Sequence, residues 1–103
     1  MKTDESAHAD LIEELAAAAE GLLVSLRLNE GIPDEKLNRL VSALSQAGEQ
    51  WRGSQDVPKR LAAILLEIYP AVEAASHLYE DEEAESIQQA AAEIFEEAIR
   101  CLQ

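Results

Sequence analysis

The residues of this chain best suited to metal chemistry are Glu73 and His77, which stand four positions apart. On a helix this spacing places both side chains on one face, where a carboxylate and an imidazole could share a metal ion. Di-iron centres in helical bundles use a Glu-x-x-His pair on each of two helices and further inward-facing glutamates. Here the spacing is Glu-x-x-x-His, it occurs once, and the only other histidine is His8. We therefore predict a surface pair, with no metal site and no cofactor.

Cys101 is the only cysteine of the chain and so its only thiol nucleophile. It falls on an apolar helical face, and its only basic neighbour in the sequence is Arg100. A reactive cysteine needs electropositive surroundings, so we predict a structural thiol. Neither histidine lies in a motif that pairs it with a serine or a cysteine, and the glycines form no phosphate-binding loop. We predict no catalytic residue and a protein that is not an enzyme.

Four segments of the chain place apolar residues three and four positions apart, as a buried helical face requires. Breaks around Asn29–Gly31, around Gly53 and after Tyr79 separate these segments, and Pro33 and Pro58 suit the first positions of helices. We expect one helix in each segment: from about Asp4 to Leu28, from Pro33 to Trp51, from Pro58 to Tyr79, and from just after the acidic run 80–83 to the last residues.

No segment alternates with period two, so the predicted fold class is all-α. Short connections favour antiparallel neighbours, and we predict an up-down antiparallel four-helix bundle. The chain forms a single helical domain over residues 1–103 in this interpretation, with residues 1–5 as a disordered tail. Pro70 should kink the third helix or make it restart, because proline cannot donate to the carbonyl of Leu66.

Two further expectations concern packing. Trp51 should close one end of the core, although an exposed tryptophan could instead serve as a binding anchor. The alanine runs 16–19 and 90–92 should let the first and last helices approach closely.

The first helix is apolar on two sides. Beside its core stripe it carries a second stripe, formed by Ala17, Gly21, Val24 and Leu28. Aromatic residues make up only 4% of the chain, so a core rich in alanine would gain from self-association. We predict that the second stripe is the interface of a homodimer. The alternative is that the fourth helix covers it within one chain.

The charge of the chain is strongly and unevenly negative. There are 21 acidic and 8 basic residues, and residues 61–103 alone carry ten acidic residues and one basic residue. An up-down path brings the first and third connections to the same end, where it gathers Glu30, Asp34, Glu80, Asp81, Glu82 and Glu83. Either these side chains are only a solvated helix end, or the acidic end docks a basic partner protein.

The same charge argues against several classes of partner. A net charge of −13 repels the phosphates of nucleic acids and anionic membrane surfaces. No apolar run approaches the roughly 20 residues that span a bilayer. The beginning of the chain has no apolar region typical of a signal peptide, and a single cysteine suits a reducing compartment. We predict a cytoplasmic protein without nucleic-acid or membrane partners.

These observations leave three hypotheses. The first is a non-enzymatic, acidic helical interaction module that forms a homodimer. The second is an acidic antagonist, such as an immunity-type inhibitor, a nucleic-acid mimic or a small chaperone of a basic client, whose binding would weaken as salt rises. The third is an enzyme built from bundle carboxylates, although most of these glutamates should face water.

Overall fold

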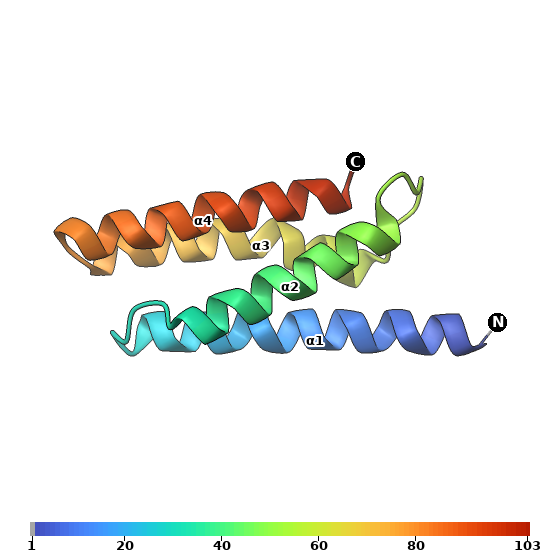
Figure 1. Cartoon of the computed structure of the whole chain (residues 1–103), viewed down its shortest axis with the longest axis horizontal. Coiled ribbons are helices and arrows are strands. Elements are labelled where there is room, and N and C mark those ends of the chain that lie inside the picture. The colour runs from blue at the N-terminus through green and yellow to red at the C-terminus, as the bar shows by residue number, and fades with distance from the viewer. Residues whose placement is uncertain (1) are drawn as a thin grey trace.

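The computed structural model describes the backbone of residues 2–103 and the side chains from His8 onward. It contains four α-helices, and a single 3-10 turn links the last two (Figure 1). The elements are α1 (Lys2–Arg27), α2 (Asp34–Trp51), α3 (Lys59–Ala75), η1 (Ser76–Leu78) and α4 (Asp81–Cys101). No strand occurs in the described chain, so the predicted all-α four-helix fold is confirmed.

Each helix runs antiparallel to the one before it, which gives the predicted up-down path (Figure 1). Helix α1 contacts α2 and α3, and helix α4 contacts the same two helices. Within residues 2–103, α1 makes no close contact with α4, and α2 makes none with α3. The two helices of each pair therefore lie diagonally opposite each other in the bundle. The connection from α2 to α3 spans one of these diagonals.

The predicted close approach of the first and last helices is therefore wrong. Ala19 lines a surface groove together with Ile64 and Ile68 of α3, and Ala90 lines another together with Leu37 of α2. Small side chains let any neighbouring helix come close, and the alanine runs do not specify which neighbour that is.

The ends of the helices follow local sequence signals. Asn29 and Gly31 adopt positive φ angles of 64° and 72° just beyond α1, as expected for residues that end a helix. Pro33 and Pro58 immediately precede α2 and α3. Each proline fixes its own φ angle and lacks an N–H group, so it fits a helix start at little cost.

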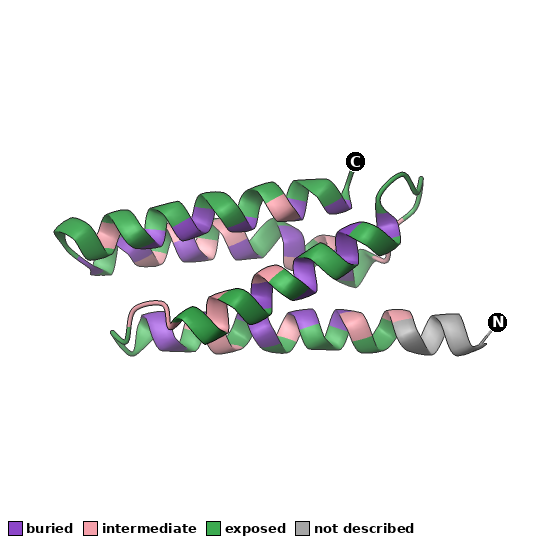
Figure 2. Cartoon of the chain, in the orientation of Figure 1, coloured by how far each residue is buried: buried purple, intermediate pink, exposed green. Residues whose placement is uncertain are grey.

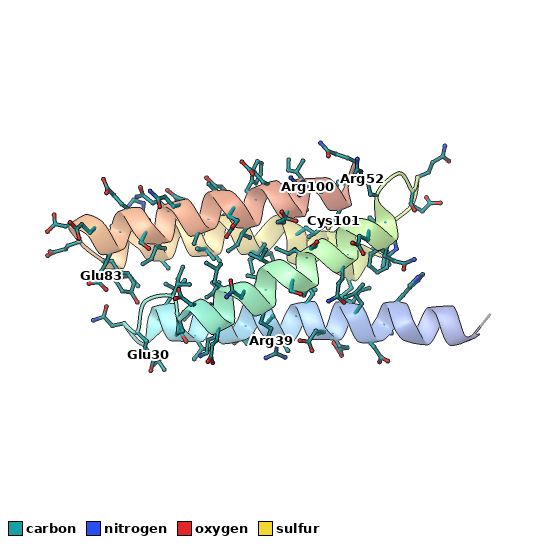
Figure 3. All side chains as sticks on the ribbon, viewed as in Figure 1. Glu30, Arg39, Arg52, Glu83, Arg100 and Cys101 are labelled. Atoms are coloured by element: carbon teal, nitrogen blue, oxygen red, sulfur yellow. The ribbon has the colours of Figure 1, made fainter. Side chains whose placement is uncertain are left out.

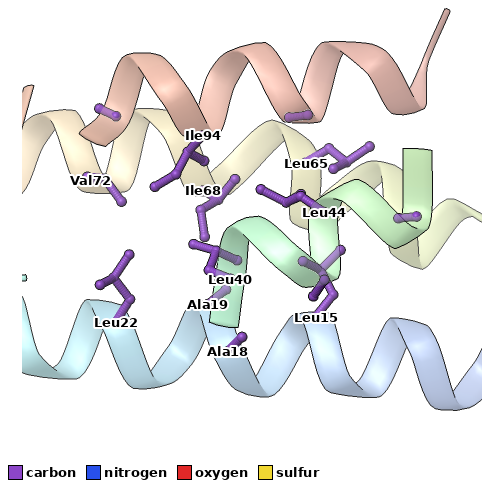
Figure 4. Packing of buried hydrophobic residues seen from close by; sticks show 14 of the residues in the cluster. Leu15, Ala18, Ala19, Leu22, Leu40, Leu44, Leu65, Ile68, Val72 and Ile94 are labelled. Carbon is purple, nitrogen blue, oxygen red and sulfur yellow. The ribbon is translucent and has the colours of Figure 1, made fainter. Parts of the chain in front are cut away.

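The core lies where the four helices face one another, and Figure 2 shows buried positions along the facing sides of the helices. Figure 4 shows leucines from α1 and α2 meeting leucine, isoleucine and valine side chains from α3 and α4. Trp51 is buried at the end of α2, with its ring centroid 5.0 Å from that of His8. The prediction that Trp51 closes one end of the core is confirmed.

Pro70 lies inside α3, which continues to Ala75 without a restart. The predicted restart is therefore wrong. Because proline has no N–H group, the carbonyl of Leu66 lacks its helical donor, and the predicted kink stays a prediction. The sequence was expected to hold no apolar stretch of membrane-spanning length, but by length and composition alone Lys59–Leu78 could cross a membrane. Core helices of soluble proteins share this property. We also predicted a disordered tail over residues 1–5. Met1 and the side chains of this segment lie outside the described part of the chain, so the tail stays a prediction.

Candidate interaction surfaces

The second stripe of the first helix lies on the outside of the molecule. We call Ala17, Gly21, Val24 and Leu28 the α1 stripe. Val24 is 38% exposed and Leu28 is 63% exposed. A Cβ atom added at Gly21 would meet no other atom within 4 Å, so the space above this glycine is open. Helix α4, the alternative cover, does not reach α1 in the described chain.

Hydrogen bonds link α1 to α2 beside this stripe. The Nζ atom of Lys36 donates to the buried hydroxyl of Ser25 and lies 3.4 Å from the carbonyl oxygen of Gly21. Farther along, the Nε of Arg39 donates to a carboxylate oxygen of Glu14 at 2.8 Å. This hydrogen bond, together with the positive charge of Arg39, lowers the pKa of Glu14. Of the α1 stripe, these contacts involve only the backbone carbonyl of Gly21, and no side chain of the stripe takes part.

A buried tyrosine, Tyr79, joins the two connections at the acidic end of the bundle. The hydroxyl of Tyr79 donates to the carbonyl oxygen of Leu26 at 2.9 Å and accepts from the N–H of Gly31, also at 2.9 Å. One side chain thereby ties the connection after α1 to the connection before α4. Figure 3 shows Glu30 and Glu83 at the same end of the bundle and Arg52 and Arg100 at the other.

The six predicted residues of the acidic end make no ion pair within residues 8–103. The four pairs in this part of the chain are Glu14–Arg39, Glu13–Arg60, Glu73–His77 and Glu97–Arg100. Residues 80–83 line an open surface depression. Asp81, Glu82 and Glu83 also occupy the first turn of α4, where negative charge favours the helix dipole. These three residues therefore have a structural role that needs no partner.

A third surface was not predicted from the sequence. Leu66 on α3 is 72% exposed, and Phe95, Ile99 and Leu102 on or just beyond α4 are 46%, 38% and 54% exposed. The rings of Tyr69 and Phe95 join the two helices, with centroids 5.0 Å apart. We call these five residues the α3–α4 face. Their spacing of three and four positions resembles that of core residues, so periodicity alone did not separate them from the core.

The residues that could take part in chemistry do not form a site in the described part of the chain. Cys101 is buried, and burial raises the pKa of its thiol to about 11, with a further contribution from the charge of Glu97. Its Sγ atom lies 3.5 Å from the carbonyl oxygen of Leu44. His77 and Glu73 form an exposed pair with 3.8 Å between Nε2 and Oε1. Three or more His, Cys, Asp or Glu residues placed to hold a metal ion do not occur together in the described chain.

No protein-family model, no curated protein and no solved structure matches this chain. Any assignment of function must therefore be argued from the three surfaces described above, namely the α1 stripe, the acidic end and the α3–α4 face.

Proposed function

We propose that this chain is a non-enzymatic helical interaction module that forms a homodimer through the α1 stripe. The observation that carries the proposal is the exposure of Val24 and Leu28 beside open space at Gly21. A two-fold axis through this region would set the α1 stripe of one copy against that of the other.

The residue sizes of the α1 stripe suit such a contact. Ala17 and Gly21 are small enough to let two helix backbones approach closely, while Val24 and Leu28 supply the apolar area that leaves water. Burial of apolar surface contributes about 25 cal/mol per Å². One helix face offers less area than a standard interface of roughly 1,600 Å², so we expect a dissociation constant on the order of 1–100 μM.

Charge works against this association. Each copy has a net charge of −13, and Glu13 and Glu20 lie next to the stripe on the same side of α1. Dissolved salt screens the repulsion between like charges, with a Debye length of about 8 Å at physiological ionic strength. The dimer should therefore become tighter as salt is added.

Sedimentation equilibrium over a micromolar concentration range tests the proposal. The full chain should form a dimer, and the double substitution Val24→Ser/Leu28→Ser should make it monomeric. Leu78→Ser is the matched control, because Leu78 is 64% exposed but lies in η1. A chain that stays monomeric up to about 1 mM, or a double variant that dimerises like the wild type, would show that the proposal is wrong.

A second candidate function is supported by the acidic end. Six carboxylates lie on or next to the two connections that Tyr79 joins, and none makes an ion pair in the described chain, which suits an acidic antagonist or a small chaperone of a basic protein. Such binding should weaken as salt rises, opposite to the behaviour expected of the dimer. Under either proposal we expect a protein that binds neither nucleic acid nor anionic membranes, because its charge repels both. We also propose a cytoplasmic location, because a single cysteine suits a reducing compartment.

A further inference from the structure

The α1 stripe has a small half and a large half. Ala17 and Gly21 come first along α1, and Val24 and Leu28, which are larger and exposed, follow them. Leu28 lies just beyond the last residue of α1, but its N–H still donates to the carbonyl oxygen of Val24 at 3.0 Å, so it continues the helical face. The stripe therefore differs in side-chain size between its two ends.

The charges beside the stripe also differ along the helix. Residues 11–28 contain four charged side chains, which are Glu13, Glu14, Glu20 and Arg27. The first two already form ion pairs with arginines of α3 and α2. Glu20 and Arg27 are exposed and form no ion pair within residues 8–103. One carboxylate and one guanidinium group are therefore free beside the stripe.

Glu20 and Arg27 lie on the same side of the stripe. Both line the groove between α1 and α3, together with Glu67 of α3. They stand two helical turns apart on α1, or roughly 10 Å at 1.5 Å per residue, so they do not reach each other within one chain. Each can pair only with a charge that another molecule brings to this side of α1.

We infer that the second copy docks with its α1 antiparallel, so that Ala17 faces Leu28 of the partner subunit and Gly21 faces Val24 of the partner subunit. This arrangement rests on the proposed dimer and adds its orientation and register. A small side chain then meets a large one at every level, which keeps the two helices at one separation along the contact. In a parallel pair, small residues would meet small residues and leave a gap at one end.

The same register brings the free charges together. In an antiparallel pair with a two-fold axis, the α3 side of one α1 lies next to the α3 side of the other. Glu20 then lies about 3 Å along the helix axis from Arg27 of the partner subunit, and symmetry forms the same pair a second time. A parallel pair would set the α3 side of one α1 against the α2 side of the other and form neither ion pair. Charge complementarity therefore selects the antiparallel second copy.

The two ion pairs set the orientation of the second copy more than its affinity. Exposed ion pairs contribute little each, and they offset only part of the repulsion between two chains of net charge −13. The dimer should therefore still become tighter as salt is added. Val24 and Leu28 supply the apolar area on which the affinity depends.

Disulfide trapping tests the orientation with the full chain. Ala17→Cys and Leu28→Cys chains are oxidised separately and as an equal mixture. The mixture should form a covalent dimer, because these two positions face each other in the antiparallel pair. Neither variant alone should crosslink, because its two cysteines would lie roughly 16 Å apart along the helix axis. The wild-type chain, whose single cysteine is buried, gives the background.

Charge reversal tests the ion pairs by sedimentation equilibrium. Glu20→Arg and Arg27→Glu should each weaken the dimer about five-fold or more, because each replaces both attractions with repulsions. Glu20→Arg/Arg27→Glu restores opposite charges at both contacts and should dimerise within about two-fold of the wild type. Glu93→Arg is the matched control and should not weaken the dimer. It changes the net charge as Glu20→Arg does, but it lies on α4, which makes no close contact with α1 within residues 2–103.

The outcomes distinguish the orientation from the dimer itself. If Val24→Ser/Leu28→Ser abolishes the dimer but Ala17→Cys chains crosslink to one another, the dimer stands and its helices run parallel. Neutral single reversals, or a double reversal that does not restore association, would show that Glu20 and Arg27 do not meet. A wild-type chain that stays monomeric up to about 1 mM would overturn both proposals. Circular dichroism checks that each variant is folded, which the exposure of the substituted positions favours.

Discussion

Removing one oxygen atom from Tyr79 should loosen the acidic end of the bundle. The Tyr79 hydroxyl, in the connection before α4, accepts from Gly31 in the connection after α1 and donates to Leu26 in the last turn of α1. The substitution Tyr79→Phe keeps the buried ring and its packing and deletes both hydrogen bonds. It therefore separates the contribution of the tether from that of the core.

The two lost hydrogen bonds are not equivalent. The carbonyl oxygen of Leu26 also accepts from the N–H of Asn29 at 3.2 Å, so it keeps a partner. The half-buried N–H of Gly31 has the Tyr79 hydroxyl as its partner and loses it. A buried donor left without a partner costs about 1–3 kcal/mol, and partial access to water places Gly31 in the lower half of that range. We expect Tyr79→Phe to lower the free energy of unfolding by about 1–2 kcal/mol, or the melting temperature by roughly 5–15 °C.

Urea unfolding followed by circular dichroism at one fixed protein concentration measures this change. The midpoint should fall while the dependence on urea stays the same, because the same surface is exposed on unfolding. Tyr69→Phe is the matched control, since the Tyr69 hydroxyl makes no hydrogen bond within residues 8–103 and its ring packs against that of Phe95 at a tilt. If both variants lose the same stability, the tether does not hold this end together and the reasoning fails.

Three other perturbations have expected outcomes. Leu44→Ala removes a fully buried side chain and should cost about 2–5 kcal/mol in urea unfolding. The pKa of the Cys101 thiol is raised from 9.0 to about 11, so the folded chain keeps a proton that the unfolded chain releases. Its stabilising contribution should therefore be complete below pH 9 and fall as the pH rises to about 11, and iodoacetamide should label it at pH 8 only after unfolding. Gly21→Ala adds a methyl group in open space, so it should raise helix stability by about 0.5–1 kcal/mol while weakening the dimer seen in sedimentation.

Much of the fold could be predicted because its signals are local. The apolar spacing of three and four positions identified the four helices, and proline, asparagine and glycine identified their ends. The exposed pairing of Glu73 with His77 and the burial of Cys101 also followed from the neighbours of each residue in the sequence. In each of these cases the physical cause lies within a few residues along the chain.

The order of the helices around the core could not be predicted in the same way. Periodicity shows which side of a helix is apolar, but it does not show which helix will cover that side. Alanine runs in the first and last helices suggested that these two meet, yet α2 and α3 lie between them. The hydrogen bonds of Tyr79 join residues 53 and 48 positions away, a separation that no local pattern reveals.

This arrangement of helices explains why apolar surface is left over. Each helix of the bundle has two close neighbours, which cover only the arc of its surface that faces them. Helix α1 is apolar over a wider arc, and so are α3 and α4 where Leu66 and Phe95 stand outward. Because α1 and α4 are diagonal to each other, a dimer formed through the α1 stripe would leave both α3–α4 faces free.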